Sequence, residues 1–189
     1  MTALRAALLA VMAILAAPIV AAAAAGAMAP VDAFLSLRFA AVPQAEFEDW
    51  MRREPGLVPG LAAHVLQGDE RTAEYLLCNP CVVPANRPDP GGSVLRYRFA
   101  AWWMSMRGAR LEVDGACGSA CTILADVLAT RGLACRGPHA ELWFHAAKDA
   151  DGTLSDIAYS PPIEAALAPL DEGFQILKGD ALAEILPTC

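Results

Sequence analysis

The clearest hydrophobic pattern lies between residues 93 and 107, where apolar side chains recur at helical spacing. The positions on this face are Leu95, Phe99, Trp102 and Met106. Ser93 stands at the start of the segment and can cap a helix. The pattern therefore predicts an amphipathic helix from Ser93 to about Arg107, with its aromatic side chains packed in the core.

The next segment alternates between apolar and polar residues and then becomes helical again. Leu111 and Val113 flank a polar residue, which predicts a strand over residues 110–114. Residues 115–118 begin and end with glycine and predict a bend. A second helix is expected from Ser119 to the glycine at position 132. Its buried stripe is expected to comprise Ala120, Ile123, Leu124, Val127 and Leu128.

Two short apolar runs follow the second helix, at residues 133–135 and 140–144, around a turn at Pro138. Both predict strands, and His145 comes directly after the second. The order helix, strand, helix, strand, strand indicates the α/β fold class for this part of the chain.

The pattern before residue 86 is different. Residues 31–67 read as helical with interruptions at proline and glycine, and residues 76–92 read as a proline-rich loop. We therefore expect three segments. They are a signal peptide over residues 1–25, a mainly helical N-terminal segment over residues 26–85, and the α/β core over residues 86–189.

The extreme N-terminus has the composition of an export signal. Arg5 gives a positive start, residues 6–20 are apolar, and residues 21–29 offer cleavage sites after small residues, the most favourable near Ala25. The alternative is an uncleaved membrane anchor, because the uncharged run is long enough to span a bilayer. A membrane is expected as a partner only in that second case.

The charge balance excludes one class of partner. The net charge is −7, from 14 Lys and Arg against 21 Asp and Glu, and the basic residues form no run. Binding to a phosphate backbone depends on clustered cations, so nucleic acid is not an expected partner.

Export changes how the cysteines are interpreted. All six follow the export segment, at Cys78, Cys81, Cys117, Cys121, Cys135 and Cys189. Disulfides persist in the periplasm and outside the cell, so we expect a periplasmic or secreted protein with structural bridges. The short loop between Cys121 and Cys135 favours that pair, which leaves Cys117 to pair with Cys78, Cys81 or Cys189.

Two other uses of these residues are less favoured. The C-x-x-C motif that ends at Cys81 permits redox chemistry, but a thioredoxin-like βαβ context is missing around it. His64, His139 and His145 form no pair with metal-ligand spacing. No metal and no organic cofactor is therefore expected.

Ser119 is the first candidate for chemistry. A serine on a sharp strand-to-helix turn is accessible, and the N–H groups that open its helix point at any anion that forms beside it. The alternative is a serine that only caps the helix. Two further features favour chemistry. His145 ends a strand that can lie beside this turn and is the base that a serine hydroxyl needs, and the glycine pair Gly91 and Gly92 can bring N–H groups to an oxyanion.

The order of these motifs resembles the ClpP/crotonase superfamily. The similar features run from Pro90-Gly91-Gly92 through the helix, strand and Cys117-Gly118-Ser119-Ala120-Cys121-Thr122 to Phe144-His145. The chain looks most like the exported ClpP-like proteins with a C-x-S-A-C-T motif. The resemblance covers about residues 90–147 and implies a truncated core of repeated ββα units behind the N-terminal helical segment.

The resemblance also implies roles for individual residues. Ser119 would be the nucleophile, His145 the base, and the N–H groups of Gly91, Gly92 and Ala120 the oxyanion hole. The family's third catalytic residue, an aspartate, follows a long handle helix for which this chain has no room. With the handle excised, Asp171 takes that position, with Glu172 and Asp156 as alternatives.

Two functions are therefore expected from the sequence. The first is an exported serine hydrolase, peptidase-like, that acts on a peptide or another acyl substrate without an ATPase partner, because the ring-building handle is missing. The second is a catalytically inactive domain of the same fold that serves as an envelope binding or structural protein. A Ser–Lys mechanism has little support, since Lys148 and Lys178 are the only lysines.

Overall fold

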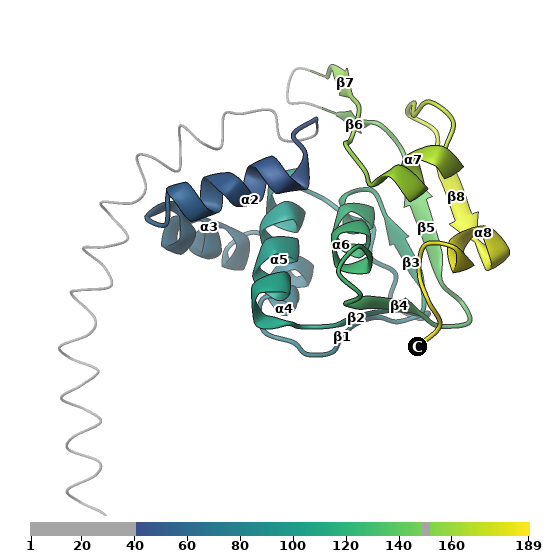
Figure 1. The fold of residues 1–189 in the computed structure, drawn as a ribbon, viewed down its shortest axis with the longest axis horizontal. Helices are drawn as coiled ribbons and strands as arrows, with labels where there is room; N and C mark the ends of the chain where they lie inside the picture. Colours follow the sequence, from purple (N-terminus) through teal and green to yellow (C-terminus); the bar gives the residue numbers. More distant parts are fainter. Residues whose placement is uncertain (1–40, 149–151) are drawn as a thin grey trace, which may run out of the picture.

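A computed structural model describes residues 41–148 and 152–189 of the chain (Figure 1). The expected signal peptide lies outside the described residues. The described helices are α2 (Gln44–Arg53), α3 (Leu57–Leu66), α4 (Glu70–Tyr75), α5 (Val94–Arg107), α6 (Ala120–Ala129), α7 (Pro161–Ala166) and α8 (Gly179–Ala183). The described strands are β1 (Cys81–Val83), β2 (Leu111–Val113), β3 (Ala116–Gly118), β4 (Ala134–Arg136), β5 (Glu141–Phe144), β6 (Ala147–Lys148), β7 (Leu154–Ser155) and β8 (Gln175–Lys178).

The strands form two three-stranded sheets and a hairpin. Sheet A has the order β1-β2-β4 and is parallel throughout. Sheet B has the order β3-β5-β8, in which β3 and β5 are parallel and β5 and β8 are antiparallel. The hairpin pairs β6 with β7. The predicted α/β fold class is confirmed.

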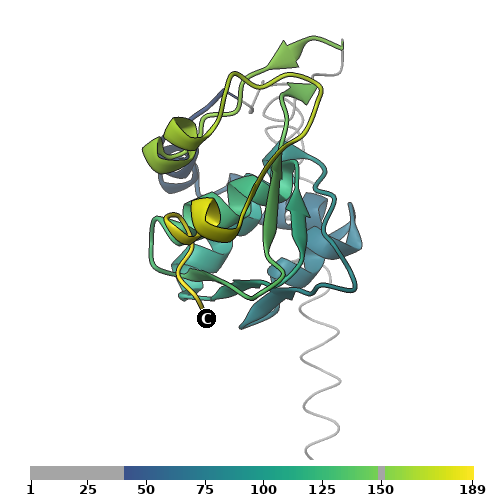
Figure 2. The same ribbon diagram turned by 90° about the vertical axis from the view of Figure 1, so that its right-hand side faces the viewer.

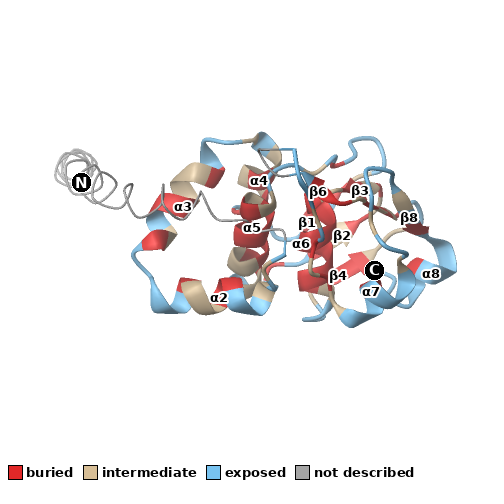
Figure 3. Cartoon of the chain, turned by 90° about the horizontal axis from the view of Figure 1, so that it is seen from above, coloured by how far each residue is buried: buried red, intermediate tan, exposed pale blue. Residues whose placement is uncertain are grey.

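Helices α5 and α6 form the centre of the molecule. They pack against each other, with α2, α3 and α4 beside α5 and the strands of both sheets beside α6 (Figure 1). Burial follows this arrangement, since α5, α6 and the strands are largely buried and the outer helices expose one side (Figure 3). Helix α6 is buried on every side, which is why all five residues of its predicted stripe are buried together with Thr122 and Asp126.

Helix α5 begins after Ser93, as predicted, although the Ser93 side chain makes no capping hydrogen bond. The predicted apolar face of this helix was wrong at one position, because Met106 is 71% exposed at the end of the helix. Arg98 is instead fully buried. Its guanidinium donates to Gln44 Oε1 at 3.3 Å, so the N-terminal helix α2 supplies part of the polar environment that this charge needs.

Two strands lie where the sequence pattern predicted a bend or a loop. Residues 115–118 contain strand β3 where a bend was expected, and β1 lies within the expected loop. Gly115 packs so closely against the Pro84 backbone that a Cβ there would meet the Pro84 oxygen at 2.5 Å. This close contact lets the chain leave β2 in sheet A and enter β3 in sheet B. Strand β1 pairs with β2, so residues on both sides of position 85 share sheet A.

The C-terminal segment contacts strands of both sheets. Helix α8 packs beside β8 and β5, and the chain end then returns to β4 (Figure 2). Thr188 forms a parallel bridge with Arg136, and Cys189 is disulfide-bonded to Cys135. No helix within the described ranges is long and apolar enough to cross a bilayer.

Candidate functional site

The backbone at Ser119 has an unusual conformation. Its φ of 52° and ψ of −128° make it the one non-glycine residue with positive φ in the part of the chain that the structure describes. Such a conformation costs on the order of 1–3 kcal/mol and persists only where the surroundings impose it. The Ser119 side chain makes no capping bond to helix α6. The interpretation of Ser119 as a routine helix cap is therefore wrong.

Contacts on both sides hold this residue in place. The Ser119 N–H donates to the Trp143 carbonyl at 2.8 Å, and the Ser119 carbonyl accepts from the Thr122 N–H at 2.9 Å. A disulfide between Cys117 and Cys121 closes a short loop across the same residues. We call residues 117–121 the Ser119 turn. These contacts hold the strained backbone of the half-buried Ser119 in place.

The loop that carries the glycine pair lies directly against the Ser119 turn. Asp89 pairs with Cys117 in a parallel bridge, in which the Asp89 N–H donates to the Ala116 carbonyl and the Gly118 N–H donates to the Asp89 carbonyl. Gly91, with φ of 81°, follows this bridge. A Cβ at Gly91 would lie 2.7 Å from both Ala120 N and Ser119 Cβ and would collide with the Gly118 oxygen. The structure therefore brings Gly91, Ser119 and Ala120 together.

Replacing Gly91 with Ala is expected to lower the free energy of unfolding by about 3 kcal/mol, because a side chain there needs both an unfavourable φ and space that the Ser119 turn occupies. Gly108→Ala is the matched control. Gly108 has φ of 62°, and a Cβ there would meet nothing within 4 Å. The control should lose only about 1 kcal/mol, the conformational part. Urea unfolding of both variants measures the difference, and equal losses would contradict the close approach.

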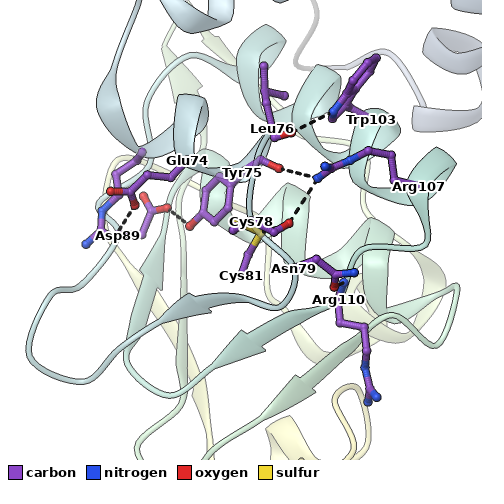
Figure 4. Close-up of a disulfide and its surroundings, with 11 residues drawn as sticks. Glu74, Tyr75, Leu76, Cys78, Asn79, Cys81, Asp89, Trp103, Arg107 and Arg110 are labelled. Carbon is purple, nitrogen blue, oxygen red and sulfur yellow. Dashed lines mark hydrogen bonds and ion pairs between the residues drawn. A yellow bond between two sulfur atoms is a disulfide. The ribbon is translucent and has the colours of Figure 1, made fainter. Parts of the chain in front are cut away.

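A buried carboxylate fixes the conformation of the glycine loop. Asp89 is 1% exposed and accepts hydrogen bonds from the Tyr75 hydroxyl at 2.5 Å, the Tyr97 hydroxyl at 2.6 Å and the Gly91 N–H at 2.8 Å. Figure 4 shows the Tyr75 ring pointing at Asp89 from the end of α4. Burial, and then the charge of Asp89, raises the pKa of both tyrosines. Both phenols therefore stay protonated and donate.

This network changes the expected oxyanion hole. The Gly91 N–H already donates to Asp89, so it is not directed at Ser119. Among the hydrogen bonds of the described residues, none uses the N–H of Gly92 or of Ala120. Ala120 is the first residue of α6, where N–H groups have no partner within the helix. Two of the three predicted donors, Gly92 and Ala120, therefore have no hydrogen-bond partner among the described residues.

His145 lies at the same edge of sheet B as Ser119. Strands β3 and β5 are parallel, with Gly118 opposite Trp143, so Ser119 and His145 both follow the carboxyl ends of neighbouring strands. The half-buried His145 ring packs against the Phe174 ring, with centroids 4.9 Å apart. In the part of the chain that the structure describes, no hydrogen bond joins the Ser119 hydroxyl to His145.

The three expected acids lie in different surroundings. The Asp171 carbonyl accepts from the Ala146 N–H at 2.8 Å, which brings the Asp171 backbone beside His145. Its carboxylate, however, accepts from the Gly173 N–H at 2.7 Å in a local turn. Glu172 pairs with Lys148 at 3.1 Å, and Asp156 is exposed after β7. None of the three carboxylates is hydrogen-bonded to His145 in this structure.

All six cysteines are paired, as predicted, but the expected partners were wrong. The bridges join Cys78 to Cys81, Cys117 to Cys121, and Cys135 to Cys189. Cys121 lies in the first turn of α6 above β3 and so reaches Cys117. Cys135 lies in β4, beside the returning C-terminus. The number of residues between Cys121 and Cys135 therefore did not predict their partners. Three disulfides indicate an oxidising environment.

The C-x-x-C bridge lies in a setting that favours a structural role. It follows the C-terminal end of α4, where the partial charge of a helix is negative and disfavours a thiolate. The Arg107 side chain reaches the carbonyls of Tyr75 and Cys78, and Asn79 Oδ1 accepts from the Arg110 N–H (Figure 4). The bridge lies between α4 and β1, and the Arg107 hydrogen bonds connect this segment to the end of α5.

A separate cavity of about 260 Å³ lies between α2, α6 and residues 158–160. The Asp126 carboxylate at its wall accepts from the Ser160 hydroxyl at 2.5 Å and from the Ser160 N–H at 2.8 Å, and burial raises the pKa of Asp126. Glu48 pairs there with Arg131 at 2.5 Å. These charged groups are bound to protein partners. Within residues 41–148 and 152–189, no cluster of three or more His, Cys, Asp or Glu could hold a metal ion.

Comparison with known protein families, with curated proteins and with solved structures finds no match to this chain. The candidate site therefore rests on its own geometry.

Sequence reasoning missed three residues beside the site: Asp89, Trp143 and Phe174. An acid directly before Pro90 and a glycine pair is a signal that could have identified Asp89 as a residue that binds the loop's own N–H groups. Phe174 and Ile176 flank polar Gln175, and this alternation is typical of a strand with one apolar face.

Proposed function

We propose that this protein is a serine hydrolase with a ClpP/crotonase-like core, in which Ser119 is the nucleophile. The observation that carries the proposal is the Ser119 turn, a serine with a strained backbone whose hydroxyl does not cap the helix that it precedes. Strain of this kind clusters at functional sites because it presents a side chain that an ordinary turn would turn away. The N–H groups of Gly92 and Ala120, which have no hydrogen-bond partner among the described residues, support the same function.

The proposed reaction follows the chemistry of these groups. Ser119 Oγ bonds to the substrate carbonyl carbon as its proton passes to the His145 ring, and the Gly92 and Ala120 N–H groups bind the oxyanion. The bond to the leaving group then breaks, and the leaving group takes the proton from His145. Water hydrolyses the acyl-enzyme in the same two stages, which returns Ser119 and releases an acid. A carboxylate such as Asp171 would need to rotate to orient His145.

The ClpP/crotonase-like core is proposed on the placement of three segments. The glycine loop runs parallel to β3 and touches the Ser119 turn, α6 follows the serine, and β5 places His145 at the same sheet edge. This is the arrangement that the sequence motifs imply. We further propose that the protein is periplasmic or secreted, which agrees with the oxidised cysteines, and that neither an ATPase nor nucleic acid is a partner.

Labelling with a fluorophosphonate tests the function. The purified oxidised protein should form one covalent adduct on Ser119, and Ser119→Ala should form none. Ser93→Ala is the matched control, because Ser93 is an exposed serine that also precedes a helix without capping it. Its labelling should equal that of the wild type. Replacing His145 with Ala should slow labelling at least about 100-fold, since a general base is lost.

A second candidate, the catalytically inactive binding or structural domain, is favoured by one observation. The Asp171 carboxylate binds the Gly173 N–H, and no acid among the described residues is hydrogen-bonded to His145. The same experiment separates the candidates. Folded protein that is not labelled, or that is labelled equally after Ser119→Ala, supports the inactive domain and removes the hydrolase.

A further inference from the structure

One face of sheet B is apolar and open to solvent. Strand pairing places Trp143 opposite Ile176 and Glu141 opposite Lys178, so these four side chains share a face. Phe174 joins them, because its ring packs edge-on against Trp143 with centroids 5.8 Å apart. The opposite face of the sheet is buried in the core through Leu142, Phe144 and Leu177.

The exposure of this face is unusual for its composition. Phe174 is 55% exposed and Ile176 is 44% exposed, whereas the side chains behind them are almost fully buried. An aromatic and a β-branched residue side by side on an open sheet face mark a surface that contacts another apolar group. We call Trp143, Phe174 and Ile176 the apolar face.

The apolar face is continuous with the proposed catalytic site. Phe174 contacts the His145 ring, and the Trp143 carbonyl accepts from the Ser119 N–H at 2.8 Å. Gly118 stands opposite Trp143 on β3 and has no side chain to separate Trp143 from the Ser119 turn. The apolar face therefore begins on the strand next to the one that ends at Ser119.

Polar groups close the far end of the face. Glu141 accepts from Trp143 Nε1 at 2.8 Å and pairs with Lys178 at 3.4 Å. From His145 to Glu141 the strand advances about 13 Å, which gives the length of the surface. The β5 backbone is paired on both sides, with β3 and with β8, so it has no free groups to bind a peptide backbone. An aliphatic chain needs none.

We infer that the apolar face binds the aliphatic chain of the substrate's acyl group, so that the hydrolase acts on acyl compounds of medium chain length. This inference rests on the proposed function. The chain lies along Trp143, Phe174 and Ile176 while its carbonyl carbon is at Ser119. Burial of each added methylene on this surface stabilises the bound acyl group.

Hydrolysis of p-nitrophenyl butyrate and p-nitrophenyl octanoate tests the inference. The wild type should have a kcat/KM for octanoate about 20-fold higher than for butyrate, because one side of the added chain is buried. Ile176→Ser and Phe174→Ser should each lower this ratio several-fold. Met106→Ser is the control, since Met106 is 71% exposed on α5 and away from sheet B. It should keep the wild-type ratio.

Several outcomes overturn the inference. The wild type could be labelled at Ser119 and yet hydrolyse the two esters with equal kcat/KM. That result removes the inference and leaves the proposed function. Faster hydrolysis of a blocked tripeptide ester than of octanoate assigns the face to peptides instead. A dimer in sedimentation that Ile176→Ser converts to monomer assigns the face to a second copy of the chain. Absence of any Ser119-dependent hydrolysis or labelling removes both proposals.

Discussion

Replacing Asp89 with Ala is expected to lower the free energy of unfolding by about 4 kcal/mol. The substitution removes a fully buried acceptor and leaves the Tyr75 hydroxyl, the Tyr97 hydroxyl and the Gly91 N–H without their partner. Each unpaired donor costs about 1–3 kcal/mol where water cannot replace the lost bond. Because the Asp89 carboxylate also holds the Gly91 N–H, its loss should loosen the glycine loop and reduce the rate of labelling at Ser119.

Two controls separate this effect from a general loss of stability. Tyr75→Phe removes one of the three donors and should lower the free energy of unfolding by about 1.5 kcal/mol. Asp49→Ala removes an exposed acid that pairs with Arg52 and Arg53, and should change it by less than about 1 kcal/mol. Urea unfolding measures all three. A loss for Asp89→Ala no larger than that for Tyr75→Phe would show that the carboxylate does not organise the network.

The second large effect is expected at the bridge between Cys135 and Cys189. These residues are 54 positions apart in sequence, so the bridge removes much conformational freedom from the unfolded chain. The double substitution Cys135→Ser and Cys189→Ser should lower the free energy of unfolding by about 4 kcal/mol. It should also free the chain end from β4, since Thr188 pairs there with Arg136.

The bridge between Cys117 and Cys121 provides the comparison. Its sequence separation is only 4, and its removal by the matching double Ser substitution should lower the free energy of unfolding by about 2 kcal/mol. Its removal should nevertheless affect labelling of Ser119 more, because this bridge spans the Ser119 turn. Urea unfolding shows which variant loses more stability, and fluorophosphonate labelling shows which loses more reactivity at Ser119. If the variant without the long bridge loses more in both assays, a special role for the short bridge at the site is contradicted.

Much of the fold could be predicted from local pattern. Helices α5 and α6 and strands β2, β4 and β5 carry periodic apolar residues and clear ends, so their existence follows from the sequence. Strand β3 could not be predicted, because three small residues give no periodicity and the strand forms only between Asp89 and β5. Arg98 is polar, and its burial depends on tertiary contacts such as the hydrogen bond to Gln44 of α2.

The candidate site divides in the same way. Ser119, Ala120 and the glycine pair could be found because short motifs specify tight turns, and the structure places Gly91 against Ser119 and Ala120. The partner of each N–H group could not be found. The use of the Gly91 N–H by Asp89 depends on Tyr75 and Tyr97 enclosing the carboxylate, and these residues come from α4 and α5. The disulfide pairing could not be predicted for the same reason, since it depends on which elements become neighbours.

The bridge at Cys189 also sets an order of events. A covalent link between residues 135 and 189 cannot form until the ribosome has added residue 189 and that residue has met an oxidant. Any shorter intermediate must keep β4 and sheet A together by non-covalent contacts alone. The thiol of Cys135 is then open to incorrect partners, so we expect the efficiency of correct pairing to depend on how quickly Cys189 becomes available.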